Sequence, residues 1–271
     1  VNSGEYKLMG LAPYGKPKYI NKINELIKKT NSGFELNLEY FLHHKHNIFE
    51  INEQGQFIYK NLFTNKLTNL LGEPRHSNDK VTEYHMDLAS SVQKVYEEIF
   101  FYLLNKIYDQ YKINNLPISG GCGMNSVANG KIKKNTKFEN IYICPNPGDA
   151  GGSVGSASFF LKNNYHIKPT VKNYAFLGNS YSNEHIKEAI IQKNLDNKFK
   201  VELLSDEDLY KETAKLIASA KILGWFQDKM EWGPRALGNR SILADARNKD
   251  VRNIINSKIK RRESFRPFAP S

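Results

Sequence analysis

Apolar residues recur at three- and four-residue steps between Met86 and Tyr108, and this spacing predicts a long amphipathic helix. The residues that carry the pattern are Leu88, Val92, Val95, Ile99, Leu103 and Ile107. Asp87 lies near the expected start of this helix, where a carboxylate interacts favourably with the helix dipole.

The residues before this helix predict shorter elements. Residues 5–15 mix apolar side chains with glycine and proline, which is typical of a short helix that runs into a structured turn. The polar, lysine-rich stretch that follows has helical character to about Asn31. Residues 34–63 resemble short strands and loops, and 55–59 is one such stretch.

Two units of the same kind follow the long helix. Residues 116–119 are strand-like and lead into the glycine-rich stretch 120–126. Residues 141–144 are again strand-like and lead into a second glycine-rich stretch, 145–153, before an apolar helix that continues through Leu161.

The character of the chain changes at residues 163–173, which are polar and contain Pro169, so we interpret them as a linker. The patterns beyond it predict a helix, a strand and a second helix, over 205–220, 222–226 and 250–259. Because helices and strands alternate, we predict an α/β fold with two domains, 1–165 and 166–271.

The composition of the 271 residues, with 40% apolar and 25% charged residues, is that of a globular protein. There is no apolar run of about 18 residues and no signal peptide, so we expect a cytoplasmic protein without a membrane partner. The two cysteines, Cys122 and Cys144, lack a metal-ligand spacing and are interpreted as buried small hydrophobes. The chain lacks an initiator methionine and stops within what resembles an ordered segment, which predicts an internal fragment.

The formal net charge of +11 indicates nucleic acid or a small anion as a ligand. Much of the excess lies in residues 221–271, where five lysines and seven arginines accompany five acidic residues, leaving a net charge of +7. Arg235, Arg240 and Arg247 do not share one helical face, so turns must bring them together. Converging guanidinium groups bind phosphate and neutralise the charge that develops in phosphoryl or acyl transfer.

Two other interpretations of this basic segment are a solvated surface and a nucleic-acid surface. A solvated surface does not require the Gly, Pro, Trp and Leu residues that are interleaved with the charges. Nucleic acid is disfavoured because four acidic residues among the arginines would repel a phosphate backbone: Asp228, Glu231, Asp245 and Glu263. We therefore predict a compact pocket for a small polyanion and no nucleic-acid partner.

The two glycine-rich turns have the composition of anion sites, because glycines let the backbone approach a ligand and a helix start offers N–H groups. Each turn places a polar residue at the helix start, Asn125 in the first and Asp149 in the second. Asp149 could meet a bound cation or cap the following helix. The histidines His43, His44 and His46 are a weaker metal candidate, because they lack an acidic partner at helical spacing.

Several of these segments resemble one known family. Residues 5–15 (EYKLMGLAPYG), 120–130 (GGCGMNSVANG) and 147–155 (PGDAGGSVG) are similar to the nodulation and antibiotic O-carbamoyltransferases, which include enzymes of tobramycin and cephamycin biosynthesis. Residues 225–247 and 256–271 also match this family closely, with Trp232 where many members have Phe. The resemblance implies the later part of an actin-like ATPase (TsaD-like) domain, followed by the start of a YrdC-like α/β domain.

The resemblance also implies roles for individual residues of the glycine-rich turns. Those that would border the adenylate of ATP are Gly120, Gly121, Asn125, Gly148, Asp149, Gly151 and Gly152. Asp149 would also bind a divalent metal, usually Fe²⁺, together with a His-x-x-x-His pair that these residues do not contain. Mg²⁺ would accompany ATP. The fragment alone is therefore expected to be inactive.

The basic positions of the family implied as phosphate and carbamoyl ligands are Lys229, Arg235, Arg240, Arg247, Lys260, Arg262 and Arg266. Lys258 and Arg261 fall on variable positions. The implied reaction makes carbamoyl-adenylate from carbamoyl phosphate and ATP, and then transfers the carbamoyl group to a hydroxyl of a small molecule or sugar. The resemblance does not identify the acceptor or the oligomeric state.

Two other functions stay open. A sugar kinase or chaperone-like ATPase of the same fold would transfer or hydrolyse the γ-phosphate of ATP and release no pyrophosphate. A non-catalytic RNA-binding module would bind RNA tightly, with an affinity that falls as salt rises.

Overall fold

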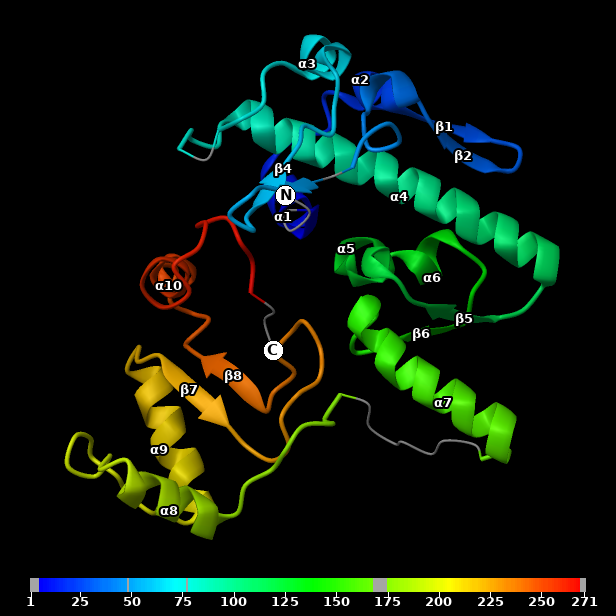
Figure 1. Cartoon of the computed structure of the whole chain (residues 1–271). Coiled ribbons are helices and arrows are strands. Elements are labelled where there is room, and N and C mark those ends of the chain that lie inside the picture. Colours follow the sequence, from blue (N-terminus) through cyan, green and yellow to red (C-terminus); the bar gives the residue numbers. More distant parts are fainter. Residues whose placement is uncertain (1–4, 48, 77, 168–174, 269–271) are drawn as a thin grey trace. The chain divides into compact units, whose positions relative to one another are not determined.

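The chain divides into two compact units in a computed structural model that describes residues 5–47, 49–76, 78–167 and 175–268 (Figure 1). The larger part of the predicted linker, from residue 168 to residue 173, lies outside the described residues. Its remaining residues belong to the end of a helix and the two residues after it.

Unit 1 comprises Val1–Leu116 and Met124–Ile141, and unit 2 comprises Pro117–Gly123 and Tyr142–Ser271. The boundaries of these compact units differ from those of the predicted domains, 1–165 and 166–271. The division into these two domains therefore stays a prediction.

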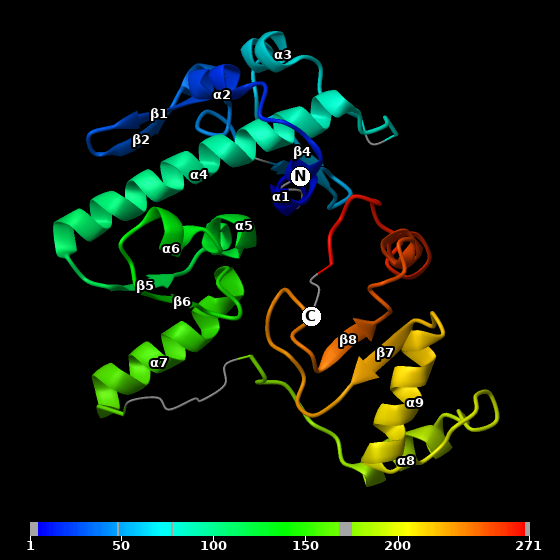
Figure 2. The ribbon, with the colours of Figure 1, turned by 180° about the vertical axis from the view of Figure 1, so that it is seen from behind.

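Unit 1 is built on α4 (Glu83–Tyr111), the long helix that the apolar spacing predicts (Figure 1). Its residues Val95 and Ile99 form a buried cluster with Ile23 and Leu26. Seen from behind, α2 and the β1–β2 hairpin follow one side of α4, and α5 and α6 lie on another (Figure 2). A helix this long therefore serves as the common support of the elements around it.

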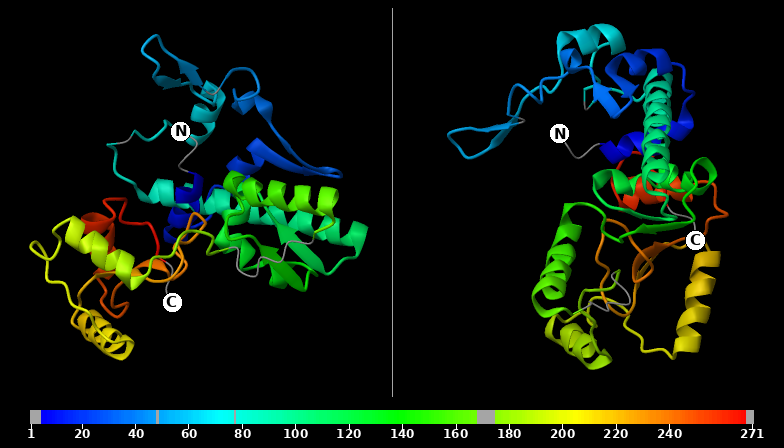
Figure 3. Two further views of the ribbon diagram at one scale, coloured as in Figure 1. Left: turned by 60° about the horizontal axis from the view of Figure 1, so that its bottom comes forward. Right: turned by 90° about the vertical axis from the view of Figure 1, so that its right-hand side faces the viewer.

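The other helices of unit 1 are α1 (Glu5–Leu11), α2 (Ile20–Leu26), α3 (Asn65–Leu71), α5 (Ser126–Asn129) and α6 (Ile132–Asn135). Two antiparallel hairpins join β1 (Ile27–Thr30) to β2 (Gly33–Leu36) and β3 (Phe49–Ile51) to β4 (Phe57–Tyr59). The exposed β3–β4 hairpin extends away from α4 in both views of Figure 3.

The prediction of helical character to about Asn31 is wrong beyond Leu26. The chain turns into β1 there, and Lys28 and Lys29 pair with Glu35 and Phe34 of β2. The Lys28 ammonium lies 3.2 Å from the Glu35 carboxylate across the hairpin, a contact that a helix would not make.

The two predicted strands that precede the glycine-rich turns are confirmed as β5 (Asn115–Ile118) and β6 (Asn140–Ile143). They form one two-stranded sheet, and the division between the compact units passes through both strands.

The remaining elements of unit 2 are α7 (Gly152–Tyr165), α8 (Asn183–Gln192), α9 (Asp206–Ala218), β7 (Leu223–Phe226), β8 (Arg240–Leu243) and α10 (Val251–Ile254). The helix predicted over 205–220 and the strand predicted over 222–226 are confirmed as α9 and β7. The helix predicted over 250–259 begins as α10 and continues as a π-helix over Ile255–Ile259. This mixture of helices and strands agrees with the predicted α/β class.

Within the residues that the structure describes, none of the helices combines the length and the apolar character that crossing a bilayer requires.

Candidate functional site

Residues 120–123 of the first glycine-rich turn and the whole second turn belong to unit 2, where they lie side by side. The Gly120 amide donates a hydrogen bond to the Pro147 carbonyl at 2.6 Å. A Cβ atom on Gly123 would lie 3.2 Å from Ile118 and 3.3 Å from Pro147, so glycine allows this close contact. Cys122, in the first turn, is exposed, so the prediction that it is buried is wrong.

The glycines of these turns differ in what surrounds them. A Cβ atom on Gly151 would lie 2.2 Å from the Asn146 carbonyl oxygen, so the fold of the turn itself requires glycine there. A Cβ atom on Gly121 or on Gly152 would meet nothing within 4 Å. Gly121 and Gly152 therefore leave open space beside the backbone, which a ligand-binding turn needs.

Asp149 is the first residue of a one-turn 3-10 helix, Asp149–Gly151, and is exposed. The N-cap of α7 is Gly151 and makes no side-chain capping hydrogen bond, so Asp149 does not cap this helix. Among the described residues, the Asp149 carboxylate has no hydrogen-bond or ion-pair partner and remains available to a ligand.

A complete metal site is not formed by the residues that the structure describes. No group of three or more His, Cys, Asp and Glu side chains gathers among them. Asp149 alone supplies one oxygen ligand, and His43 and His44 contact each other with ring centroids 5.7 Å apart. The described residues do not fit the predicted metal as a full ligand set, and we derive no step through it.

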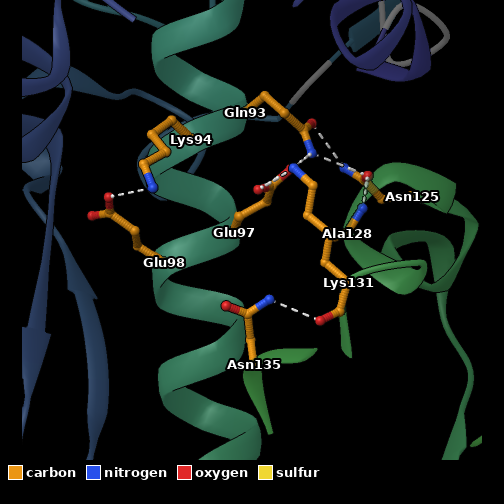
Figure 4. Close-up of polar contacts among 8 residues, drawn as sticks. All are labelled: Gln93, Lys94, Glu97, Glu98, Asn125, Ala128, Lys131 and Asn135. Carbon is orange, nitrogen blue, oxygen red and sulfur yellow. Dashed lines mark hydrogen bonds and ion pairs between the residues drawn. The ribbon is translucent and has the colours of Figure 1, made fainter. Parts of the chain in front are cut away.

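Asn125 lies in unit 1 and is the N-cap of α5 (Figure 4). Its side-chain oxygen accepts a hydrogen bond from the Ala128 amide at 3.1 Å. Its amide group also pairs with that of Gln93 on α4, at 3.2 Å in one direction and 3.0 Å in the other. Both acceptor positions of the Asn125 oxygen are therefore used, and one N–H remains to meet a ligand.

A half-buried ion pair between Glu97 and Lys131 supports this amide pair (Figure 4). Gln93 donates to Glu97 at 3.0 Å, and the Lys131 ammonium donates to the same carboxylate. Gln93 and Glu97 are 6% and 7% exposed, so their polar groups depend on these partners. The sequence interpretation missed both residues, although their four-residue spacing beside the apolar stripe was a signal.

The first motif, residues 5–15, packs against α4. The loop that follows it, residues 16–19, is bonded to the first turns of the same helix. The Lys16 amide and the Lys18 ammonium each lie 2.7 Å from the buried Asp87 carboxylate. Both groups lower the pKa of Asp87, and the hydrogen bond from the Lys16 N–H has the larger effect. Asp87 therefore anchors a loop and does not serve the first turn of the helix, which corrects its predicted role.

The basic segment forms a hairpin in which β7 and β8 pair antiparallel, with Phe226 opposite Arg240. We call residues 227–239, which join these strands, the basic loop. Asn239 is 8% exposed and closes the loop, because its side chain donates to the Lys229 carbonyl at 2.8 Å. A Cβ atom on Gly233 would lie 2.7 Å from the Pro145 carbonyl oxygen, so the loop requires glycine at this corner.

Glu231 organises the far side of the basic loop. One of its carboxylate oxygens accepts hydrogen bonds from the backbone amides of Leu237 at 2.6 Å, Asn239 at 2.7 Å and Arg240 at 3.2 Å. Gly238, between two of these donors, has a φ of 112°, which favours glycine. Sequence reasoning counted Glu231 only as a negative charge among arginines.

Arg240 is largely engaged within the hairpin. Its guanidinium lies 3.2 Å from the centroid of the Phe226 ring and donates to the carbonyls of Gln227, Asn239 and Asp228. Its Nε–H is buried and has no acceptor among the described groups. Arg240 therefore clamps the base of the basic loop and keeps one donor unused.

Lys229 and Arg235 differ from Arg240, because both are exposed on the basic loop. Neither side chain makes a hydrogen bond or ion pair with another described residue. Their charges therefore remain available for an anionic ligand.

Arg247 pairs with Asp245, two residues earlier. Its Nε lies 2.9 Å from one carboxylate oxygen, and a terminal nitrogen lies 2.7 Å from the other. This guanidinium, together with the Arg247 backbone N–H, lowers the pKa of Asp245 to about 2. The Arg247 charge is thus shared with a protein carboxylate.

The last three predicted ligands follow α10. Asn256 is fully buried, and its side chain accepts from Arg262 Nε at 2.7 Å and donates to the Arg266 carbonyl at 2.9 Å. Arg262 also lies 4.6 Å from the centroid of the Phe268 ring. Lys260 is exposed. Asn256 therefore fixes the segment that carries Arg262 and Arg266, a role that the sequence did not reveal.

These contacts group the predicted ligands locally: Lys229, Arg235 and Arg240 on the hairpin, Arg247 with Asp245, and Lys260, Arg262 and Arg266 around Asn256. Four acidic residues among the arginines were the argument against a nucleic-acid ligand. Three of them have partners within the protein: Glu231, Asp245 and Glu263, the last at 3.9 Å from Arg266. A single pocket that gathers all seven cations stays a prediction.

Comparison with known proteins shows to which family the chain is similar. Residues 1–158 match the carbamoyltransferase N-terminus, and residues 214–271 match the carbamoyltransferase C-terminus. An uncharacterized protein of Synechocystis, sll1178, is 42% identical over 280 residues, which cover 100% of the chain and 43% of that protein.

Two nodulation proteins are similar over the same range. Nodulation protein NolNO of Sinorhizobium fredii is 31% identical over 98% of the chain and 36% of its own length. Nodulation protein NolO of Bradyrhizobium diazoefficiens is 30% identical over 98% of the chain and 44% of its own length. The chain thus spans about two fifths of the length of these three relatives. Because the N-terminal match alone covers more than half of it, the chain belongs to the carbamoyltransferase family.

Proposed function

We propose that this chain is part of an O-carbamoyltransferase that works in two steps. Water first hydrolyses carbamoyl phosphate to carbamate and inorganic phosphate. The carbamate then attacks the α-phosphate of ATP and forms carbamoyl-adenylate with release of pyrophosphate. The hydroxyl of a small molecule or sugar then attacks the carbamoyl carbon, and AMP leaves. The basic residues after β7 would serve the first step.

The observation that carries this proposal is the state of Lys229 and Arg235. Both project from a loop whose backbone is fixed by Glu231 and Asn239, and neither shares its charge with a described carboxylate. A solvated basic surface does not need such a fixed loop. Two cations on a fixed loop suit a small polyanion such as carbamoyl phosphate or the triphosphate of ATP.

The other predicted basic ligands would take supporting roles. Arg240 would hold the base of the loop through its hydrogen bonds to the carbonyls of Gln227, Asn239 and Asp228, and would add its positive charge to the site. Arg262 and Arg266 would act from the segment that Asn256 fixes, together with the exposed Lys260. Arg247 would contribute if a ligand phosphate replaces Asp245 as its partner, since phosphate and carboxylate suit the same guanidinium geometry.

The glycine-rich turns would receive the adenylate. Gly121 and Gly152 have open space beside the backbone, and Gly120 and Gly148 shape the turns that hold them. We assign these turns to the later part of an actin-like, TsaD-like domain, and the hairpin with α10 to the start of a YrdC-like domain. Asn125, in unit 1, keeps one side-chain N–H for a ligand, and its assignment to the adenylate rests on the family resemblance alone.

Asp149 would provide one ligand of a divalent metal, with Fe²⁺ as the expected ion and Mg²⁺ accompanying ATP. The other ligands would come from outside the described residues, since no further group gathers with Asp149.

The proposal is tested by incubating the full-length protein with carbamoyl phosphate and ATP labelled at the γ-phosphate, without an acceptor. We expect carbamoyl-AMP by mass spectrometry and the label in pyrophosphate. Label in inorganic phosphate or in a phosphorylated acceptor would instead identify an ATPase or a kinase. Tight, salt-sensitive RNA binding without either product would identify an RNA-binding module.

A further inference from the structure

Glu231 stands apart from the other acids of the basic segment in the partners it takes. Asp245 pairs directly with Arg247, and Glu263 lies 3.9 Å from Arg266. Glu231 makes no ion pair with a described lysine or arginine. Its oxygen instead accepts from three backbone amides, those of residues 237, 239 and 240.

Three amides converging on one oxygen form a backbone nest, an arrangement that binds anions. The nest needs an unusual backbone, which Gly238 supplies with its φ of 112°. Without the carboxylate, the amide of Asn239, a residue only 8% exposed, would lose its acceptor. The negative charge also offsets the mutual repulsion of cations gathered on one hairpin.

We propose that Glu231 is a positioning residue that shapes the basic loop for its anionic substrate. The carboxylate fixes the backbone from Leu237 to Arg240 and leaves the side chains of Lys229 and Arg235 unpaired. A carboxylate that paired with these cations directly would compete with the substrate. Glu231 thus supplies the negative charge that the loop needs without consuming its positive charges.

The substrate in this inference rests on the proposed function and is taken as carbamoyl phosphate. The shaping of the loop does not rest on it, because the three hydrogen bonds are features of the protein alone. Two measurements therefore separate the two parts: hydrogen exchange of the backbone in the basic loop, and the dissociation constant of carbamoyl phosphate.

The experiment compares the full-length protein with its Glu231→Gln and Glu231→Ala variants. Glutamine keeps an acceptor oxygen but loses the charge, and charge-assisted hydrogen bonds are about twice as strong as neutral ones. We expect faster exchange at residues 237–240 and about tenfold weaker carbamoyl phosphate binding in Glu231→Ala, with Glu231→Gln in between. Glu212→Gln, on the exposed surface of α9, is the matched control and should change neither quantity.

A purely structural role is distinguished by the double variant Glu231→Ala/Arg235→Ala. If Glu231 acts through the loop that presents Arg235, its loss should weaken binding about twofold or less once Arg235 is absent. Unchanged exchange in Glu231→Ala, or fully additive losses in the double variant, would overturn the inference. If the unaltered protein fails to bind carbamoyl phosphate, the proposed function falls and the substrate role of Glu231 falls with it, whatever the exchange shows.

Discussion

Lys131 donates to both carboxylate oxygens of Glu97, at 2.7 Å each, and so neutralises the most deeply placed acid of the middle of α4 (Figure 4). The Glu97 side chain is 9% exposed and that of Lys131 is 47% exposed, so the protein shields the carboxylate from solvent but leaves the ammonium partly open to it. Through Gln93 the same carboxylate is linked to Asn125, which caps α5 directly after the first glycine-rich turn. The helix start that follows this turn is therefore held by the long helix.

Replacing Lys131 by methionine should destabilise unit 1 by about 1–3 kcal/mol, because the buried Glu97 carboxylate then lacks its cation. Urea denaturation followed by circular dichroism measures this change. Lys133→Met is the matched control, since Lys133 is exposed on α6 and its ammonium makes no hydrogen bond or ion pair with a described residue. Equal stability of the two variants would show that the ion pair contributes nothing.

Gly15 lies so close to the backbone of α4 that no side chain fits there. A Cβ atom there would lie 2.1 Å from the carbonyl carbon of Met86, within the backbone of α4. Gly15→Ala should therefore lower the stability of unit 1 by several kcal/mol, on the order of the cost of severe overpacking. Gly155→Ala, in α7 with nothing within 4 Å, should stabilise the protein by about 0.5–1 kcal/mol. Thermal unfolding of both variants checks the contrast.

Asn256 should be as important to the basic segment as any arginine that it holds. Asn256→Ala leaves the Arg266 carbonyl and the Arg262 Nε–H without their buried partner, at a cost of about 1–3 kcal/mol. Faster hydrogen exchange in residues 262–268 should accompany this loss. Ser257→Ala is the neighbouring control, because Ser257 is exposed and bonds within its own helix. Unchanged exchange in Asn256→Ala would refute this role.

The elements that the sequence predicts well are those with a local cause. The stripe of apolar residues in α4 recurs within one helix, and each glycine-rich turn directly follows its own strand. The change from helix to strand at Ile27 was missed because it depends on pairing with β2. Strand β8 was missed for the same reason, since only β7 makes Arg240 a strand residue opposite Phe226.

The residues that hold the candidate site were harder to find, because their partners lie elsewhere in the chain. Gln93 and Asn125 are separated by 32 positions, and Lys131 and Glu97 by 34. Glu231 lies within the motif itself, but its role depends on the backbone conformation of Gly238 and its neighbours. Residue types predict a basic segment, whereas the direction of each amide becomes visible only in three dimensions.

Arg235 should affect activity more than basic residues at variable positions. Its side chain is exposed on the fixed basic loop, so Arg235→Ala should leave stability within about 0.5 kcal/mol. If it binds carbamoyl phosphate, the KM for this substrate should rise at least about tenfold. Lys258→Ala, another exposed cation of unit 2, should leave KM unchanged. Steady-state formation of carbamoyl-AMP measures both, and equal KM values would remove Arg235 from the site.

The Asp245–Arg247 pair predicts how stability changes in acid. Since the guanidinium lowers the pKa of Asp245 from its ordinary value of 3.8 to about 2, the folded protein holds this proton less tightly than the unfolded chain. The pair therefore stabilises the fold above about pH 4, and its contribution is lost as the pH falls towards 2. Asp245→Asn lacks this titration and should lose less stability over the same interval. Urea midpoints of both proteins at several pH values test this, and parallel curves would show that Arg247 does not stabilise the Asp245 carboxylate in solution.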